Sequence, residues 1–101
     1  MSKKTLRDTY TVRKSGRSLQ FTINPNIVEE LKIREGEIFQ ILLFKVKRAK
    51  TGEIIENIAE WFPAKLSTKG TSKRITIKAQ VVKNLDLKEE DSISIEISKE
   101  L

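Results

Sequence analysis

The chain repeats itself at an offset of 54 residues, the distance from Gly16 to Gly70, and this repeat restricts the fold more than any other feature. The alignment needs no gap. The identical pairs are Gly16/Gly70, Ser18/Ser72, Thr22/Thr76, Ile23/Ile77, Val28/Val82, Leu31/Leu85, Glu35/Glu89 and Ile41/Ile95. Apolar residues also align in Val12/Leu66, Phe21/Ile75, Ile27/Val81, Ile33/Leu87, Phe39/Ile93 and Leu43/Ile97. We therefore interpret the chain as a tandem duplication of one structural unit.

The length of the chain predicts that the two units share one core. At 101 residues the chain has the size of an ordinary domain. A unit of about 35 residues is too small to fold alone without staples. We predict a single domain at 10–98, made of repeats at 10–46 and 64–98, with a basic N-terminal arm at 1–9 and a connector hairpin at 47–63.

Each repeat predicts two strands, a short helix and a third strand. In the first repeat, residues 9–14 and 19–23 alternate between apolar and polar, which indicates a hairpin around a glycine turn. Asn24-Pro25 is a typical helix start, because Asn is a strong N-cap and Pro is preferred at the first helical position. Residues 38–46 are rich in β-branched and aromatic side chains and predict a buried strand.

The second repeat predicts the same elements, so the fold class is mainly β with two short helices. The expected elements are a strand from Leu66, a returning strand at 74–78, a helix at 79–85 and a strand at 93–97.

The connector at 47–63 has no counterpart in the repeat. A turn near Gly52 predicts that the preceding strand returns as a long hairpin. A helix over part of residues 53–62 is the alternative that the pattern leaves open. Trp61 and Phe62 are both expected to close the core.

The composition excludes several kinds of chemistry. There is no Cys, so neither a disulfide framework nor a thiolate metal site can form. There is no His either, which removes the commonest zinc ligand and the usual general base. We therefore expect no enzyme, no metal site and no cofactor. No apolar run is long enough to cross a membrane or to serve as a signal peptide, so we expect a cytoplasmic protein without a membrane partner.

The net charge of +6 is concentrated in two segments. Residues 1–20 and 61–80 each carry a net charge of +5, whereas residues 21–40 and 81–101 carry −2 and −3. Taken alone, each basic segment could be an ordinary solvated surface. Because the two basic segments begin equivalent parts of the two repeats, we expect them to form one shared basic face.

Several short motifs carry a family resemblance. They are Val12-Arg13-Lys14, Phe21-Thr22-Ile23, Ile27-Val28, Leu31 with Ile33, and Glu35-Gly36-Glu37 in the first unit, and Ile75-Thr76-Ile77, Val81-Val82, Leu85 with Leu87, and Glu90-Asp91 in the second. With the β-β-α-β order, these motifs resemble the AbrB/MazE/SpoVT swapped-hairpin family. Members with one unit dimerise through interlocking hairpins, so the resemblance implies a fused pseudo-dimer, either monomeric or paired again as a homodimer. A double-psi-like barrel is the second fold that the duplicated plan leaves open.

The two units keep different parts of the family's basic set. The basic position ahead of the second strand is Gln20 in the first unit and Arg74 in the second. The basic pair Arg13-Lys14 is replaced by Ser67-Thr68 in the second unit.

The resemblance implies a transcriptional regulator that binds double-stranded DNA through the basic hairpin face. Lys and Arg on adjacent strands can follow phosphates and gain affinity by counterion release. The candidate contacts are Arg13, Lys14, Arg17, Lys69, Lys73, Arg74 and Lys78, supported by Lys3, Lys4 and Arg7 of the arm. Aromatic residues do not interleave with these cations, so we do not expect a stacking platform for single strands. The alternative is an antitoxin or protein-assembly module of the same fold without direct DNA binding, although the tail after Ile97 is short for wrapping a toxin.

Overall fold

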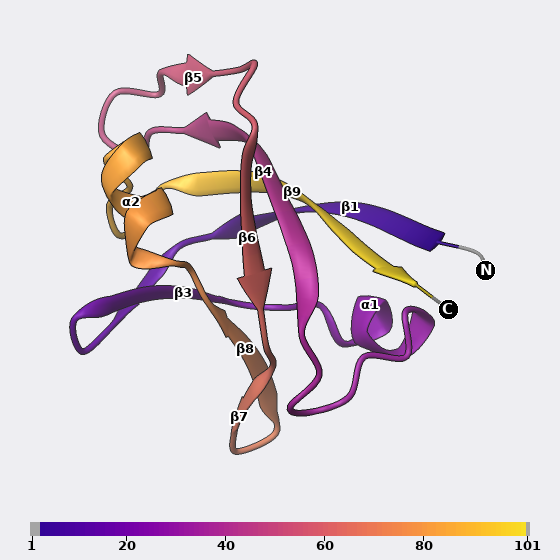
Figure 1. The fold of residues 1–101 in the computed structure, drawn as a ribbon. Helices are drawn as coiled ribbons and strands as arrows, with labels where there is room; N and C mark the ends of the chain where they lie inside the picture. The colour runs from indigo at the N-terminus through magenta and orange to yellow at the C-terminus, as the bar shows by residue number, and fades with distance from the viewer. Residues whose placement is uncertain (1–2, 101) are drawn as a thin grey trace.

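A computed structural model describes residues 3–100 of the chain (Figure 1). The described elements are β1 (Lys3–Thr11), β2 (Arg13–Ser15), β3 (Ser18–Thr22), α1 (Pro25–Glu30), β4 (Phe39–Lys47), β5 (Ile54–Ile55), β6 (Glu60–Ala64), β7 (Ser67–Lys69), β8 (Ser72–Thr76), α2 (Ala79–Leu85) and β9 (Ser92–Glu100). The predicted class, mainly β with two short helices, is confirmed. Neither helix is long and apolar enough to cross a membrane, within the part of the chain described.

The strands form two antiparallel sheets, and both sheets combine strands from the two halves of the chain. The five-stranded sheet has the order β1-β9-β4-β5, with β6 also paired to β4. The four-stranded sheet has the order β2-β3-β8-β7. Figure 1 shows β1, β9 and β4 side by side, with the β7–β8 hairpin projecting below them.

The central strands of the four-stranded sheet, β3 and β8, pair across the two repeats. The amide of Ile23 donates to the carbonyl of Lys73 over 3.0 Å, and the amide of Ile77 donates to the carbonyl of Leu19 over 2.9 Å. These two bonds are equivalent under the offset of the sequence repeat, since residue 77 corresponds to 23 and residue 73 to 19. Exchanging the two repeats therefore leaves this pairing unchanged.

The five-stranded sheet has the same relation at its centre. Ile41 lies opposite Ile97 and Leu43 lies opposite Ile95, and each pair corresponds to the other under the repeat offset. The flanking strands obey the same symmetry: β1 pairs with β9, and β6 pairs with β4. In the second half β6 thus holds the place of β1, upstream of the predicted repeat start at residue 64.

Residues 3–9 are not the separate arm that we expected at 1–9. They form most of β1, which pairs with β9 along all nine of its residues. Leu6 and Tyr10 lie on the same face of β1 and pack against the core. Burial of these two apolar side chains holds the segment on the sheet. Residues 1 and 2 lie outside the described part of the chain.

A single hydrophobic cluster fills the space between the elements, and both repeats contribute to it. Its fully buried large members include Val12, Phe21, Ile23, Leu31, Ile41, Leu43, Val46, Phe62, Ile75, Ile93, Ile95 and Ile97. Because strands from each half cover the apolar residues of the other, neither half could bury its own apolar face alone.

The two helices begin differently, although they occupy equivalent places in the repeat. The side chain of Asn24 caps α1 by accepting a hydrogen bond from the amide of Asn26 over 2.9 Å, as expected for an Asn N-cap. Lys78 holds the same position before α2 and makes no side-chain cap. The side chain of Lys78 therefore takes no part in capping α2.

Tyr10 links β1 to the start of α1 through two contacts. Its ring stacks on Phe21 with 4.8 Å between ring centroids, and its phenol oxygen accepts a hydrogen bond from the amide of Asn24 over 3.0 Å. Burial raises the pKa of the Tyr10 phenol well above its ordinary value.

The connector contains two strands, β5 and β6, so the hairpin interpretation is confirmed and the helix alternative is wrong. The expectation that both aromatic residues close the core is correct for Phe62, which is fully buried, and wrong for Trp61, whose residue is 51% exposed. Neighbouring residues of a strand point to opposite faces, so only one of the two can reach the core.

Arg48 and Asp91 join the connector to the second repeat. The carboxylate of Asp91 accepts hydrogen bonds from the amides of Ala49 and Lys88, each over 3.0 Å, and from the Arg48 guanidinium over 3.1 Å. Arg48 also donates to the carbonyl oxygens of Leu85 and Asp86 at the end of α2. Burial alone would raise the pKa of Asp91, but these hydrogen bonds and the guanidinium charge hold it below the ordinary value.

Candidate nucleic-acid interface

The four-stranded sheet contains five cations and no acidic residue. Its strands carry Arg13, Lys14, Lys69, Lys73 and Arg74. Arg17 lies in the turn between β2 and β3, and Lys78 follows β8 by two residues. The structure therefore brings all seven predicted cations onto or beside one sheet, although they come from two distant segments of the chain.

One face of this sheet is turned away from the core. Phe21 and Ile75, opposite each other on the central strands, are buried, so the residues next to them along each strand lie on the other side. We call this side the outer face. By strand register it consists of Arg13, Ser15, Ser18, Gln20, Thr22, Ser67, Lys69, Ser72, Arg74 and Thr76.

Arg74 is the only charged residue of the outer face on the two central strands. It lies between Thr22 of β3 and Ser67 of β7 in the strand register. Its Nε atom is buried and has no hydrogen-bond partner among residues 3–100. A buried unpaired donor is costly, so a rearrangement of the Arg74 side chain that gives Nε an acceptor would be favourable.

Lys14 and Lys73 lie on the opposite side of the sheet from the outer face, near the strand ends. Lys14 is exposed, whereas Lys73 is half-buried. The ammonium group of Lys73 donates to the hydroxyl of Thr68 over 2.9 Å and lies 3.5 Å from a carboxylate oxygen of Glu35. The seven predicted residues thus form two groups rather than one continuous patch.

Acidic turns meet the basic sheet at its margins. Arg13 forms an ion pair with Glu90, and the amide of Lys14 donates to the carboxylate of Glu89 over 3.3 Å. The side chains of Arg13 and Glu90 are both more than half exposed. Exposed ion pairs are worth about 0–1 kcal/mol, so a phosphate can replace the carboxylate at little cost.

Arg17 and Lys78 line one hollow beside the outer face. The hollow has a volume of about 230 Å³ and lies between the start of β3 and the start of α2, where Thr76 and Val82 also line it. Both cations are exposed. They therefore extend the positive charge of the sheet past the end of β8.

From the sequence we expected only cations in the interface, and the neutral polar residues of the outer face were missed. Gln20 and the hydroxyl residues Ser18, Thr22, Ser72 and Thr76 lie among the charges in the strand register. Such side chains donate hydrogen bonds to phosphates or base edges. The alternation of apolar and polar residues along both strands was the signal that could have identified them.

The support expected from Lys3, Lys4 and Arg7 is not part of this interface. These residues lie in β1, in the other sheet. Lys4 pairs with Glu30 over 3.0 Å, and Arg7 pairs with Glu96 over 3.0 Å while its guanidinium lies above the Phe44 ring. Lys4 and Arg7 are thus held by acidic partners away from the four-stranded sheet.

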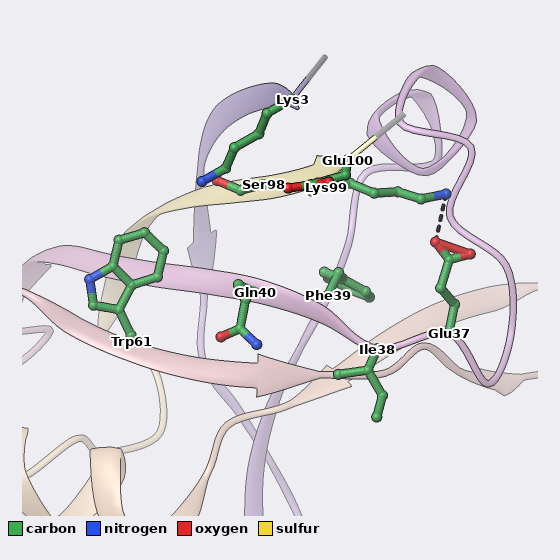
Figure 2. A pocket seen from close by; sticks show the side chains of 9 residues that line it. All are labelled: Lys3, Glu37, Ile38, Phe39, Gln40, Trp61, Ser98, Lys99 and Glu100. Atoms are coloured by element: carbon green, nitrogen blue, oxygen red, sulfur yellow. Dashed lines mark ion pairs between the residues drawn. The ribbon is translucent and has the colours of Figure 1, made fainter. Parts of the chain in front are cut away.

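A second hollow, of about 340 Å³, lies on the five-stranded sheet (Figure 2). The exposed Trp61 borders it, together with Gln40 and Ile38. Lys99 and Glu37 form an ion pair over 2.6 Å at its margin, and the hydrogen bond from Lys99 lowers the pKa of the Glu37 carboxyl. This pair links β9 to the turn before β4.

Comparison with protein-family models, with curated proteins and with solved structures found no match. The function of this chain therefore has to be inferred from its own residues.

Proposed function

We propose that this chain is a DNA-binding protein of the AbrB/MazE/SpoVT type, with two swapped-hairpin units fused in one chain. It binds duplex DNA through the sheet β2-β3-β8-β7 and acts as a transcriptional regulator. The observation that carries the proposal is the charge of this sheet: five cations from both halves of the chain and no acidic residue.

The strand pairing supports the swapped-hairpin assignment. The first strand of each half pairs with the last strand of the other half, as β1 does with β9 and β6 does with β4. A double-psi-like barrel would close its strands around one axis, whereas the strands here divide between two separate sheets. The division into sheets therefore favours interlocking hairpins.

The proposed mechanism begins with phosphate contacts. Lys69 and Arg74 on the outer face, with Arg17 and Lys78 beside it, neutralise phosphates and release condensed counterions. Arg13 joins them by exchanging the Glu90 carboxylate for a phosphate. Hydroxyl groups of the outer face then add hydrogen bonds that orient the sheet on the duplex.

An amide-shift titration tests the proposal. Isotope-labelled protein is titrated with a short mixed-sequence duplex, and the shifts of backbone amides are followed. We expect the largest changes at residues 13–22 and 67–78 and small changes at residues 49–60. Changes confined to the connector around Lys45, Lys47, Arg48 and Lys50 would place the DNA site elsewhere.

The same titration separates the proposal from its alternative. If no amide shifts when duplex is added, the chain does not bind DNA directly, and a protein-assembly module of the same fold becomes the better explanation. The exposed indole of Trp61 on the five-stranded sheet is the observation that favours that alternative.

A further inference from the structure

The outer face of the four-stranded sheet is symmetric in its backbone and asymmetric in its chemistry. Gln20 and Arg74 are equivalent under the repeat offset, and they occupy equivalent places in the pairing, opposite Thr76 and Thr22 respectively. The same position therefore carries a neutral amide in one half of the molecule and a cation in the other.

The difference extends to two further positions of the repeat, one on β7 and one just after β8. Lys69 corresponds to Ser15, and Lys78 corresponds to Asn24, whose side chain is engaged in capping α1. The first half supplies one cation to the outer face, Arg13, and this residue is paired with Glu90. On the outer face itself the cations without a carboxylate partner, Lys69 and Arg74, therefore come from the second half, while Arg17 of the first half lies beside that face.

The two halves consequently suit different parts of a duplex. Cations bind the phosphate backbone with little regard to sequence, whereas Gln can make a bidentate contact with the N6 and N7 atoms of adenine. Gln20 is half-buried on a central strand, between Arg13 and Thr76 in the strand register, on the face that we propose meets the duplex.

We propose that the DNA site of this protein is non-palindromic and that the protein binds it in one orientation. The second half holds the backbone through Lys69, Arg74 and Lys78, and the first half reads bases through Gln20. A symmetric dimer reads two equal half-sites, but this chain presents two unequal surfaces to its site. The inference rests on the proposed function and adds that the recognised DNA sequence lacks twofold symmetry.

Selection from a pool of duplexes with a randomised central segment tests the form of the site. The parent chain should enrich a consensus without twofold symmetry. Gln20→Ala should lose preference on one side of that consensus by roughly 5- to 150-fold, the value of one bidentate base contact. The salt dependence of binding should stay unchanged in this variant, because no phosphate contact is removed.

Two exchange variants provide the matched controls. Gln20→Arg makes the central positions alike and should shift the consensus towards a palindrome, with a salt slope steeper by about 0.9. Arg74→Gln should make the slope shallower by about 0.9 and leave the preference at the Gln20 side intact.

A cleavage experiment tests the orientation directly. The chain contains no Cys, so Ser18→Cys and Ser72→Cys each introduce one attachment point, at equivalent positions of the outer face. With an iron chelate attached, each variant should cut the selected duplex on one side of the site, and the two variants should cut opposite sides.

The results distinguish this inference from the proposed function. A palindromic consensus, the lack of any consensus, or cuts on both sides by each variant would overturn the single orientation while leaving DNA binding in place. Failure of the parent chain to bind any duplex in the pool at low salt would overturn both.

Discussion

Phe21 lies directly opposite Ile75 in the β3–β8 pairing, and the two residues occupy the same position of the two sequence repeats. Leu42 and Glu96 are a second such pair, at the centre of the five-stranded sheet. A residue that faces its own counterpart marks an axis of twofold pseudosymmetry. The two halves of the chain therefore meet as two subunits of a dimer would, around one core.

The helix residues Leu31 and Leu85 are equivalent in the repeat but differ in burial, and this difference predicts unequal stability losses. Leu31 is fully buried, whereas Leu85 is only partly buried. Leu31→Ala should lower the free energy of unfolding by about 2–5 kcal/mol, and Leu85→Ala should lower it less. Denaturant unfolding measures both. Equal losses would mean that the two helices pack alike, against the observed burial.

Removing the Asp91 carboxylate should destabilise the junction between the connector and the second repeat. An Asn side chain cannot accept from the amides of Ala49 and Lys88 and from Arg48 together, so a buried donor loses its partner. Asp91→Asn should lower the free energy of unfolding by about 1–3 kcal/mol at neutral pH. Glu53→Gln, at an exposed side chain of the same connector, is the control and should have little effect.

The pH dependence of the same variant gives an independent check. Because folding lowers the pKa of Asp91, its ionised form stabilises the fold above the ordinary carboxyl pKa, and that stability is lost as the pH falls towards the folded-state pKa. The stability difference between the parent chain and Asp91→Asn should therefore shrink below about pH 4. A difference that stays constant through the acid range would contradict the assignment.

Tyr10 should resist ionisation while the chain is folded. The phenol is partly buried, and this burial raises its pKa above the ordinary value of 10.0, so the stability that it contributes below pH 10.0 is lost as the pH rises. Tyr10 is the only tyrosine, so the ultraviolet absorbance of tyrosinate follows its ionisation alone. Tyrosinate should appear together with alkaline unfolding. Titration near pH 10.0 in the folded chain would contradict the burial of this ring.

Local patterns were sufficient to predict most elements of the fold. Alternation identified the strands that carry Phe21 and Ile75, and Asn24-Pro25 marked the first helix correctly. The arm at 1–9 was mistaken because the partner of β1 is β9, at the other end of the described chain. Pairing over such a separation leaves little local signal in residues 3–9, where Leu6 is the single apolar side chain.

The sequence could predict that basic residues of both halves share one sheet, but not how they are arranged on it. The repeat offset and the charge profile identified Lys69 and Arg74 as members of one basic surface, and both lie on the outer face. The ion pairs of Arg13 with Glu90 and of Lys73 with Glu35 could not be foreseen. They depend on where the acidic turns of one half meet the strands of the other, which is a tertiary relation.

The central claim is that the four-stranded sheet binds the phosphates of duplex DNA. Lys69 and Lys78 are the most suitable probes, because both are exposed and neither belongs to an ion pair among residues 3–100. Lys69→Gln with Lys78→Gln removes two charges from the interface. Lys47→Gln with Lys50→Gln removes the same charge from exposed positions at the end of β4 and in the turn after it.

The direct test is the affinity for a labelled duplex measured over a series of salt concentrations. The slope of log affinity against log salt should become shallower by about 1.8 in the Lys69/Lys78 variant, about 0.9 for each lost phosphate contact. The Lys47/Lys50 variant should keep the parent slope. An unchanged slope in the first variant, or an equal loss in the second, would contradict binding through this sheet.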